Sequence, residues 1–275
     1  MVRRITAALA ATALVLGLAA CGSDTDESGA SASPDATLKV GVSPVPHGEI
    51  LTYIKDNLAE QAGLKLEIVE FTDYVQPNRA LEEKQLDANY FQTVPYLETE
   101  KQAKGYKFTA LSPVHIEPLG LYSKKATSLE ALPEKAVVAI PNDPTNSGRA
   151  LNLLAQHGII TLKEGAGTSA TQRDIADNPK QLQFRELEAA QLPRSLDDTD
   201  ASVINGNYAI ESGLKPATDA LALEKAENNP NANLVVVRDG EQNDPRVVKL
   251  EELLHSAEVK KFIEEKYQGS VLPAF

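Results

Sequence analysis

Hydrophobic residues recur with two different periods from residue 38 to the end of the chain. Short stretches with apolar residues at every second position predict strands, and longer stretches with apolar residues three or four apart predict helices. Leu38–Val42 is the first predicted strand and Gly48–Gln61 the first predicted helix. The other predicted strands are 66–70, 88–91, 136–140, 184–187, 201–204 and 234–237. The other predicted helices are 77–83, 96–105, 150–156, 192–196 and two between 245 and 267.

This alternation of strands and helices favours an α/β fold with parallel sheets covered by helices. Lys107–Ser123, a long extended stretch broken by prolines, and the late strand Leu234–Val237 are natural crossings between two such sheets. In these folds a ligand binds at the carboxyl ends of the strands. We therefore expect two lobes, one from 38–122 plus 233–275 and the other from 123–232.

The first 37 residues have another pattern. Arg3 and Arg4 precede an uncharged, mainly apolar run that ends at residue 20, which is typical of a signal peptide and too short to span a bilayer. Small residues then precede Cys21, the single cysteine of the chain, as in the lipobox of bacterial lipoproteins. A lipid on Cys21 would hold the protein on the outer face of a membrane. The polar stretch 21–37 then reads as a flexible tether. An ordinary cleaved signal with an incidental cysteine is the alternative.

Composition narrows the classes of function. After removal of the signal peptide, the chain has 25 basic and 39 acidic residues, a net charge of −14. This negative charge argues against a nucleic acid partner. The four histidines have no ligand spacing, so we expect no metal site. No pattern of a nucleophile with its base and no dinucleotide loop is present, so we expect neither an enzyme nor a cofactor.

Polar chemistry is concentrated in the loop that follows strand 136–140. Thr145 or Asn146 could cap the helix that is predicted to begin at Ala150, and the free N–H groups at its start favour an anion. Arg149 adds a planar group suited to gripping a carboxylate with two hydrogen bonds. A capped helix with a solvated arginine is the alternative.

Aromatic and amide side chains in other loops extend this candidate site. Three aromatic residues fall at or just after predicted strands and could line an apolar slot for a ligand side chain: Tyr74, Phe91 and Tyr96. Core packing is the alternative, above all for Phe91. Asn205 and Asn233 flank two strands and could receive an ammonium or a carboxylate group. Turn formation is the competing interpretation, and we favour it for Asn207.

Several ordered blocks carry a resemblance to a known family. They are residues 71–78 (FTDYVQPN), 87–97 (DANYFQTVPYL), 119–125 (LGLYSKK), 141–149 (PNDPTNSGR), 191–198 (QLPRSLDD) and 203–208 (VINGNY). From about Leu38 to the C-terminal helices, the chain resembles the methionine-binding lipoproteins of ABC importers, the NlpA/MetQ type. The resemblance implies a type II periplasmic-binding-protein clamp with the ligand between its lobes. It also implies that L-methionine, with D-methionine as a further candidate, is delivered to a permease and an ATPase.

The resemblance also implies roles for individual residues. Asn146 and Arg149 would hold the carboxylate of the amino acid, and Asn205 and Asn233 would fix its backbone. The three aromatic residues would surround the thioether, a favourable contact for sulfur. Family members usually have histidine where this pocket has Thr93. That departure leaves a methionine dipeptide or another small apolar amino acid open as the ligand, and a surface sensor or interaction lipoprotein is a further alternative.

Overall fold

The computed structural model describes residue 33 and residues 36–275, which fall within one compact unit, Ala32–Phe275. The predicted signal peptide (1–20), the lipidation site Cys21 and most of the predicted tether lie outside the described residues. Within the described part of the chain, no helix has both the length and the apolar character that crossing a bilayer requires.

The larger sheet has six strands in the order β13-β4-β12-β3-β1-β2. Its strands are β1 (Leu38–Val42), β2 (Leu66–Glu70), β3 (Ala88–Thr93), β4 (Phe108–Ile116), β12 (Ala232–Arg238) and β13 (Leu272–Pro273). β1 runs parallel to β2 and β3, whereas β12 runs antiparallel to β3 and β4. The sheet is therefore mixed rather than purely parallel.

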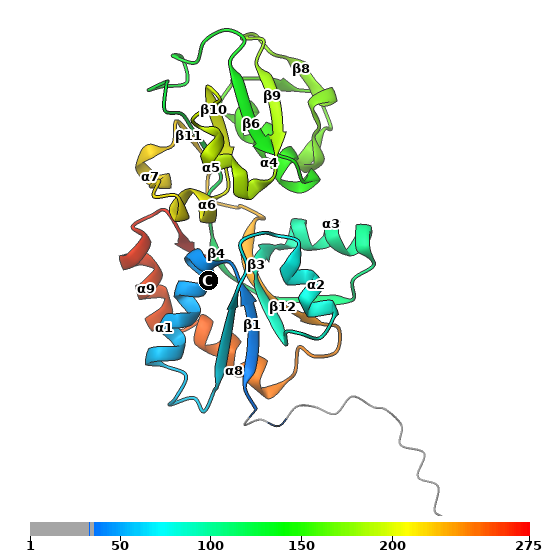
Figure 1. The fold of residues 1–275 in the computed structure, drawn as a ribbon, viewed down its shortest axis with the longest axis vertical. Coiled ribbons are helices and arrows are strands. Elements are labelled where there is room, and N and C mark those ends of the chain that lie inside the picture. Colours follow the sequence, from blue (N-terminus) through cyan, green and yellow to red (C-terminus); the bar gives the residue numbers. More distant parts are fainter. Residues whose placement is uncertain (1–32, 34–35) are drawn as a thin grey trace, which may run out of the picture. The chain divides into compact units, whose positions relative to one another are not determined.

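Helices cover this sheet with their apolar faces. They are α1 (Glu49–Asn57), α2 (Gln76–Glu82), α3 (Val94–Lys104), α8 (Pro245–Leu254) and α9 (Ala257–Tyr267), and the turn η1 (Pro44–Gly48) leads into α1. α1 lies beside α9 although about 200 residues separate them (Figure 1). Ile50 and Ile54 of α1 and Ile263 of α9 are fully buried in the same core as Val40. The spacing of these residues by three or four positions is what predicted the helices.

The smaller sheet has five strands in the order β11-β5-β10-β6-β9. They are β5 (Gly120–Tyr122), β6 (Val137–Pro141), β9 (Gln183–Leu187), β10 (Ala201–Ile204) and β11 (Ala222–Leu223). The associated helices are α4 (Pro144–Gln156), α5 (Leu192–Ser195), α6 (Gly206–Glu211) and α7 (Pro216–Asp219), and a separate hairpin pairs β7 (Thr161–Leu162) with β8 (Ile175–Asp177). A second core, with Ile140, Leu151 and Val203 at its centre, lies between α4 and this sheet.

Two short segments connect the sheets, and we name them the crossing segments. The first, residues 117–119, joins β4 to β5, and the second, residues 224–231, joins β11 to β12. β5 hydrogen-bonds to β10 and β11, so residues 120–122 belong to the smaller sheet although the predicted lobe limit falls after residue 122. The exact lobe limits stay a prediction, since sheet pairing alone does not define a lobe.

Candidate functional site

A narrow cavity of about 30 Å³ lies where loops from the two sheets meet. It is lined by all eight residues expected to bind ligand: Tyr74, Phe91, Thr93, Tyr96, Asn146, Arg149, Asn205 and Asn233. Four further residues complete the lining: Gln92, Glu117, Gly206 and Asn207. The space is about that of one water molecule in the liquid. An amino acid can therefore enter only if the lobes or the lining side chains move apart.

Helix α4 begins earlier than predicted, and this changes the chemistry of its first turn. Asp143, not Thr145 or Asn146, is the N-cap, and its carboxylate accepts the backbone N–H of Asn146 at 2.9 Å. The predicted cap was wrong because Pro144 already occupies the first helical position, which suits proline. An anion does lie at this helix start, but it is the protein's own carboxylate. Burial raises the pKa of Asp143.

A chain of amides leads from this cap into the cavity. The Asn146 side chain donates to Asp143 at 3.0 Å and accepts from Nδ2 of Asn205 at 2.9 Å. Oδ1 of Asn205 and Nδ2 of Asn207 are buried and have no hydrogen-bond partner among the described residues. Buried polar atoms are costly to leave unpaired. An acceptor and a donor in one cavity wall therefore point to a ligand with both kinds of group.

Arg149 lies on α4 and is held by both crossing segments. Its Nε donates to Glu224 at 2.9 Å, and its Nη2 donates to Glu224 and, at 2.9 Å, to the carbonyl of Glu117. Burial would lower the pKa of Arg149, but the nearby Glu224 carboxylate outweighs it and raises that pKa. The Nη1 group has no acceptor within the described part of the chain, so it is the part of the guanidinium that is available to a ligand carboxylate.

The three predicted aromatic residues do form one cluster. The ring centre of Tyr74 lies 6.0 Å from that of Phe91 and 5.9 Å from that of Tyr96, which are typical separations for interacting rings. Phe91 is buried, as expected of a core residue, but it also faces the cavity. Its two predicted roles are therefore compatible.

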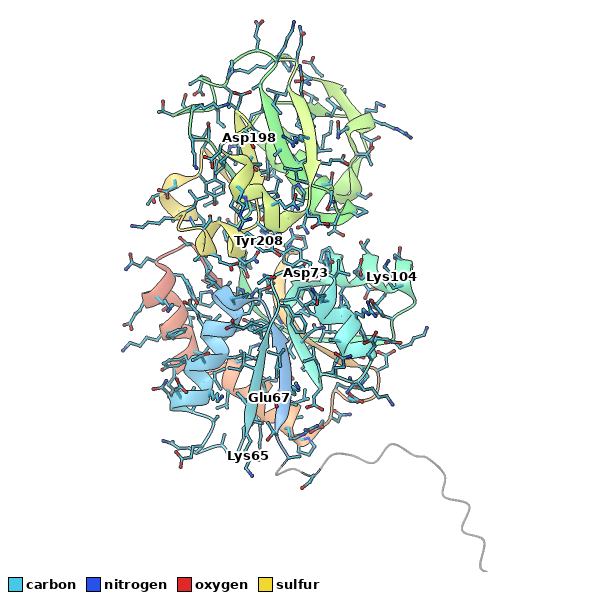
Figure 2. The ribbon with its side chains drawn as sticks, viewed as in Figure 1. Lys65, Glu67, Asp73, Lys104, Asp198 and Tyr208 are labelled. Atoms are coloured by element: carbon cyan, nitrogen blue, oxygen red, sulfur yellow. The ribbon has the colours of Figure 1, made fainter. Side chains whose placement is uncertain are left out.

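Contacts across the cavity join the two sides of the site. The Tyr74 hydroxyl donates to Oδ1 of Asn207 at 2.5 Å, and the Tyr208 hydroxyl donates to the carbonyl of Thr72 at 3.1 Å. Figure 2 labels Tyr208 near Asp73, which follows Thr72, at the junction of the two sheets. Burial raises the pKa of Tyr74 far above its ordinary value, so the phenol keeps the proton that it donates.

Thr93 and Asn233 occupy neighbouring strands and have structural partners. The Thr93 hydroxyl is the N-cap of α3 and accepts the backbone N–H of Tyr96 at 3.5 Å, a long and weak bond. Asn233, opposite Thr93 in the β3–β12 pairing, accepts from Nε2 of His47 at 3.0 Å. Both therefore contribute to the cavity wall and to local structure.

Behind Asn233, the fold gathers two histidines and a glutamate that are far apart in sequence. Nε2 of His115 lies 2.8 Å and Nε2 of His47 3.2 Å from Oε1 of Glu117. Burial lowers the pKa of His47 to about 4 and that of His115 to about 3, while burial raises the pKa of Glu117. The hydroxyl of Tyr90 lies 2.5 Å from Nδ1 of His115. His115 therefore fits a neutral ring that accepts from Tyr90 and donates to Glu117.

The same three side chains have the composition of a metal site. Their ligand atoms lie within 4.8 Å of one another, and each residue is buried. The four histidines lack ligand spacing in the sequence, yet the fold brings His47 and His115 together. The hydrogen bonds above account for the placement of the Nε2 atoms without a metal.

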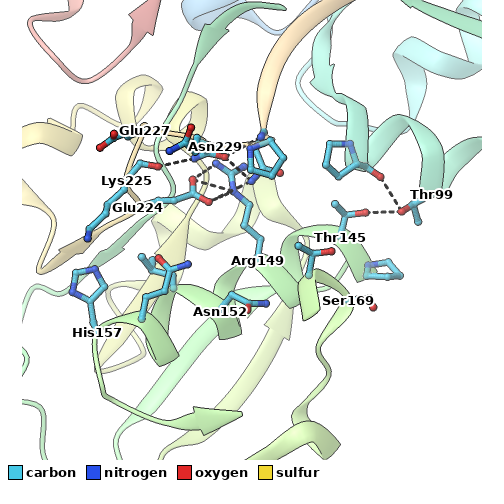
Figure 3. A pocket seen from close by; sticks show the side chains of 18 residues that line it. Thr99, Thr145, Arg149, Asn152, His157, Ser169, Glu224, Lys225, Glu227 and Asn229 are labelled. Atoms are coloured by element: carbon cyan, nitrogen blue, oxygen red, sulfur yellow. Dashed lines mark hydrogen bonds and ion pairs between the residues drawn. The ribbon is translucent and has the colours of Figure 1, made fainter. Parts of the chain in front are cut away.

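A second, larger cavity of about 640 Å³ shares Arg149 with the narrow cavity (Figure 3). It is bounded by α4, by the start of α3 and by the second crossing segment. Glu224 lines it, and the Arg149–Glu224 pair and the 2.9 Å contact between the Thr145 and Thr99 hydroxyls are both drawn in Figure 3.

Sequence reasoning missed Glu117, Asn207 and Glu224. The sequence contained a feature that could have identified Glu117 as a site residue. It is the single carboxylate in the extended stretch that was predicted to cross between the lobes. Asn207 was assigned to a turn, but its side chain lines the cavity and accepts from Tyr74. No sequence feature identifies Glu224 as a site residue, because nothing near it in sequence indicates that it pairs with Arg149, 75 residues away.

Comparisons with known proteins agree with this architecture. The chain is 41% identical over 260 residues to the methionine-binding lipoprotein MetQ of Bacillus subtilis, covering 93% of each chain. It is 39% identical to the D-methionine-binding lipoprotein MetQ of Escherichia coli strain K12, covering 94% of this chain and 93% of the relative. A nutrient-binding protein from Burkholderia cenocepacia, solved bound to methionine, superposes with a TM-score of 0.84 and 47% identity, covering 87% of this chain and all of the other.

The predicted fold and the predicted resemblance are thereby confirmed. The fold is the two-lobed α/β clamp of periplasmic substrate-binding proteins. The family model described as NlpA lipoprotein matches residues 38–275, which is every strand and helix of the structure. The chain belongs to the NlpA lipoprotein family of substrate-binding proteins.

Proposed function

We propose that this protein captures methionine at the cell surface and delivers it to an ABC importer. The observation that carries the proposal is the composition of the narrow cavity. Aromatic rings lie on one side. On the other lie Arg149, whose Nη1 group has no acceptor among the described residues, and two amide atoms that have no partner in that part of the chain. An α-amino acid with an apolar side chain has the matching groups. The names of the relatives, which include binders of methionine and of D-methionine, support the same substrate.

Calorimetry on the mature chain, purified with its lipid in detergent, tests this proposal. The protein is first unfolded and refolded to remove any carried ligand, and L- and D-methionine are then titrated beside the other standard amino acids. A ligand that binds only the folded state stabilises it by about 4 kcal/mol at a thousand-fold excess over Kd, so thermal unfolding gives an independent readout. Methionine should give a saturable response that glutamate and lysine do not. No response to any amino acid would overturn the proposal.

A methionine dipeptide is a second candidate ligand, and the larger cavity favours it. That cavity of about 640 Å³ begins at Arg149, so a ligand that is extended beyond its first residue has adjoining space. Thr93, smaller than the histidine expected at this position, leaves the pocket wall without an imidazole. Methionyl dipeptides therefore belong in the same titration. Tighter binding of a dipeptide than of methionine would change the proposed substrate to the dipeptide and leave the proposed role in an ABC importer unchanged.

We further propose that lipid on Cys21 anchors the protein at the outer face of the membrane, where it meets a permease and its ATPase. The lipobox pattern and the family support the anchor. Cys21→Ser should release the protein from the membrane fraction and abolish labelling with a palmitate analogue. Methionine uptake by cells should fall with the protein's deletion. Unchanged uptake would favour the sensor or interaction role instead.

A further inference from the structure

His47 lies behind the wall of the narrow cavity, in the turn η1 that leads into α1, and does not line the cavity itself. It is buried, and its ring packs edge-on against the rings of Tyr90 and His115, with centres 4.7 and 4.8 Å away. The Tyr267 hydroxyl holds the same turn by donating to the carbonyl of Pro46 at 3.3 Å. Such close packing leaves the imidazole little room to rotate.

The contacts of His47 determine which ring nitrogen carries the proton. Burial lowers the pKa of His47 to about 4, so at pH 7 the ring is neutral and has a single N–H. Its Nε2 lies 3.0 Å from Oδ1 of Asn233 and 3.2 Å from Oε1 of Glu117, whereas Nδ1 is buried and has no hydrogen-bond partner among the described residues. A proton on Nε2 serves both oxygens, but a proton on Nδ1 would leave the Nε2 lone pair facing them. Nε2 is therefore the donor.

This donor fixes the orientation of the Asn233 amide. Asn233 lies on β12 between Thr93 of β3 and His115 of β4, and its buried side chain lines the narrow cavity. Its Oδ1 accepts from His47, and the reversed amide would place two donors against each other. Nδ2 is left without an acceptor in the part of the chain that the structure describes. A donor in such a wall needs an acceptor from the ligand.

The acceptors of an α-amino acid with an apolar side chain are the oxygens of its carboxylate. We infer that His47 is a positioning residue for ligand binding: its Nε2–H holds the Asn233 amide so that Nδ2 donates to the ligand carboxylate. The inference rests on the proposed binding of an amino acid. Asn233 then shares the carboxylate with Nη1 of Arg149, and hydrogen bonds to a charged group are stronger than those between neutral groups. Without His47 the amide can turn and present its oxygen, which repels the carboxylate.

A double-mutant cycle between His47 and Asn233 tests this inference. Methionine is titrated calorimetrically into the mature lipoprotein in detergent and into His47→Leu, Asn233→Ala and the double variant. His47→Leu should lose about tenfold in affinity, the scale of a hydrogen bond to a charged group. In the Asn233→Ala background the same change should alter affinity by less than about twofold, since no amide is left to position. His47→Gln, which can donate an amide N–H to Asn233, should bind methionine within about threefold of the parent.

Tyr267→Phe is the control for general loosening of the turn. It removes the hydrogen bond to Pro46 but leaves the contact between His47 and Asn233, so methionine affinity should not change. A loss in this control as large as that in His47→Leu would show that packing of the turn is what matters. A His47→Leu effect that persists in the Asn233→Ala background would show that His47 acts through another group, such as Glu117. Either result, or parental affinity in His47→Leu, overturns the inference and leaves the proposed function intact.

Thermal unfolding of each variant shows whether it is folded. If His47→Leu does not fold, His47→Asn takes its place in the cycle, because the asparagine amide is one methylene shorter than that of glutamine and falls short of Asn233. Parental affinity in His47→Asn would then overturn the inference. If the parent itself does not bind methionine, the proposed function fails, and the inference with it.

Discussion

Arg149 both faces the ligand cavity and stabilises the fold, so the simplest substitution cannot separate the two roles. Arg149→Ala would leave Glu224 buried without its cation, and breaking a buried pair in this way costs about 3–5 kcal/mol. Loss of binding by that variant would therefore say little about the ligand. A substitution that keeps the charge is needed to isolate the planar grip on a carboxylate.

Arg149→Lys is that substitution. The ammonium group of the introduced lysine can still pair with Glu224. It lacks the planar fork of N–H groups with which the guanidinium would hold a carboxylate. We expect methionine affinity to fall about tenfold or more, while the melting temperature changes far less than in Arg149→Ala. Calorimetry and thermal unfolding measure the two effects. Arg79→Lys, at a largely exposed pair with Glu83, is the matched control. Binding by Arg149→Lys equal to that of the parent would contradict the carboxylate assignment.

The two buried histidines predict how stability depends on pH. In the unfolded chain an imidazole takes up a proton as the pH falls through about 6.5. In the folded protein, burial holds the pKa of His47 at about 4 and that of His115 at about 3. Between these limits the unfolded state binds more protons, so the free energy of unfolding falls as the pH is lowered. Glu117, whose pKa is raised, acts in the opposite direction over part of this range.

His47→Gln should therefore flatten this pH dependence. By pH 5 each imidazole contributes a loss of at most about 2 kcal/mol, and the variant lacks one of the two. Urea unfolding of both proteins at pH 7 and pH 5 measures the difference. His157→Gln, at an exposed position, should keep the parental slope. An equal slope in His47→Gln and the parent would mean that His47 is not held neutral in the folded state.

At the scale of elements, the start of α4 determines the geometry of one wall of the cavity. Asp143 accepts from the backbone and the side chain of Asn146, and Asn146 in turn accepts from Asn205. The capping residue thus positions, through one intermediate side chain, an amide whose Oδ1 atom is unpaired in the cavity. In the proposed binding site, helix capping and ligand recognition are therefore coupled.

Asp143→Ala should therefore affect both stability and binding. Loss of an N-cap costs about 0.5–2 kcal/mol, and Asn146 would be free to rotate away from Asn205. Ser256 caps α9 by accepting the backbone N–H of Val259 at 3.3 Å, and α9 does not line the cavity. Ser256→Ala should show a similar stability loss with unchanged methionine affinity. If the two variants bind methionine equally well, the amide chain does not position the site.

The elements and most of the cavity could be predicted because they depend on local patterns. Strands Leu38–Val42 and Leu66–Glu70 have their predicted bounds, and the eight predicted lining residues lie in loops, near strand ends or in the first two turns of helices, at the edges that meet in such folds. The start of α4 could also have been predicted, since Asp143 followed by Pro144 is a typical N-cap with proline in the first turn.

The partners of these residues could not be predicted in the same way. Arg149 pairs with Glu224 only because the second crossing segment returns past α4, and His115 lies beside His47 only because β4 and β1, the strand before the turn that carries His47, belong to the same sheet. The pattern of hydrophobic and polar residues near Glu224 does not indicate its pairing with Arg149. Charge balance in the cavity is therefore a property of tertiary structure, and sequence reasoning that identified Arg149 still could not say whether its charge was free.

At the scale of the whole molecule, the crossing segments and the ligand cavity are directly connected. Arg149 donates to the carbonyl of Glu117 in the first crossing segment and to Glu224 in the second. Glu224 also accepts the backbone N–H of Leu119 at 3.2 Å, which ties the two segments to each other. A ligand that binds Nη1 of Arg149 would therefore contact the side chain that is hydrogen-bonded to both crossing segments.

Tyr74→Phe tests whether contacts between the lobes slow the release of ligand. The substitution keeps the ring beside Phe91 and Tyr96 but removes the 2.5 Å hydrogen bond to Asn207 that joins the two sides of the cavity. One such bond contributes about 0.5–1.5 kcal/mol, so methionine affinity should fall about two- to tenfold.

The loss should appear mainly as faster dissociation in stopped-flow measurements, because the bond forms only after the lobes have met around the ligand. Tyr53→Phe is the control, since the Tyr53 ring stacks on Phe262 at 4.4 Å and neither residue lines the cavity. A slower association rate with unchanged dissociation would instead place the Tyr74–Asn207 contact in the open protein, where it would help to preform the site rather than to retain the ligand.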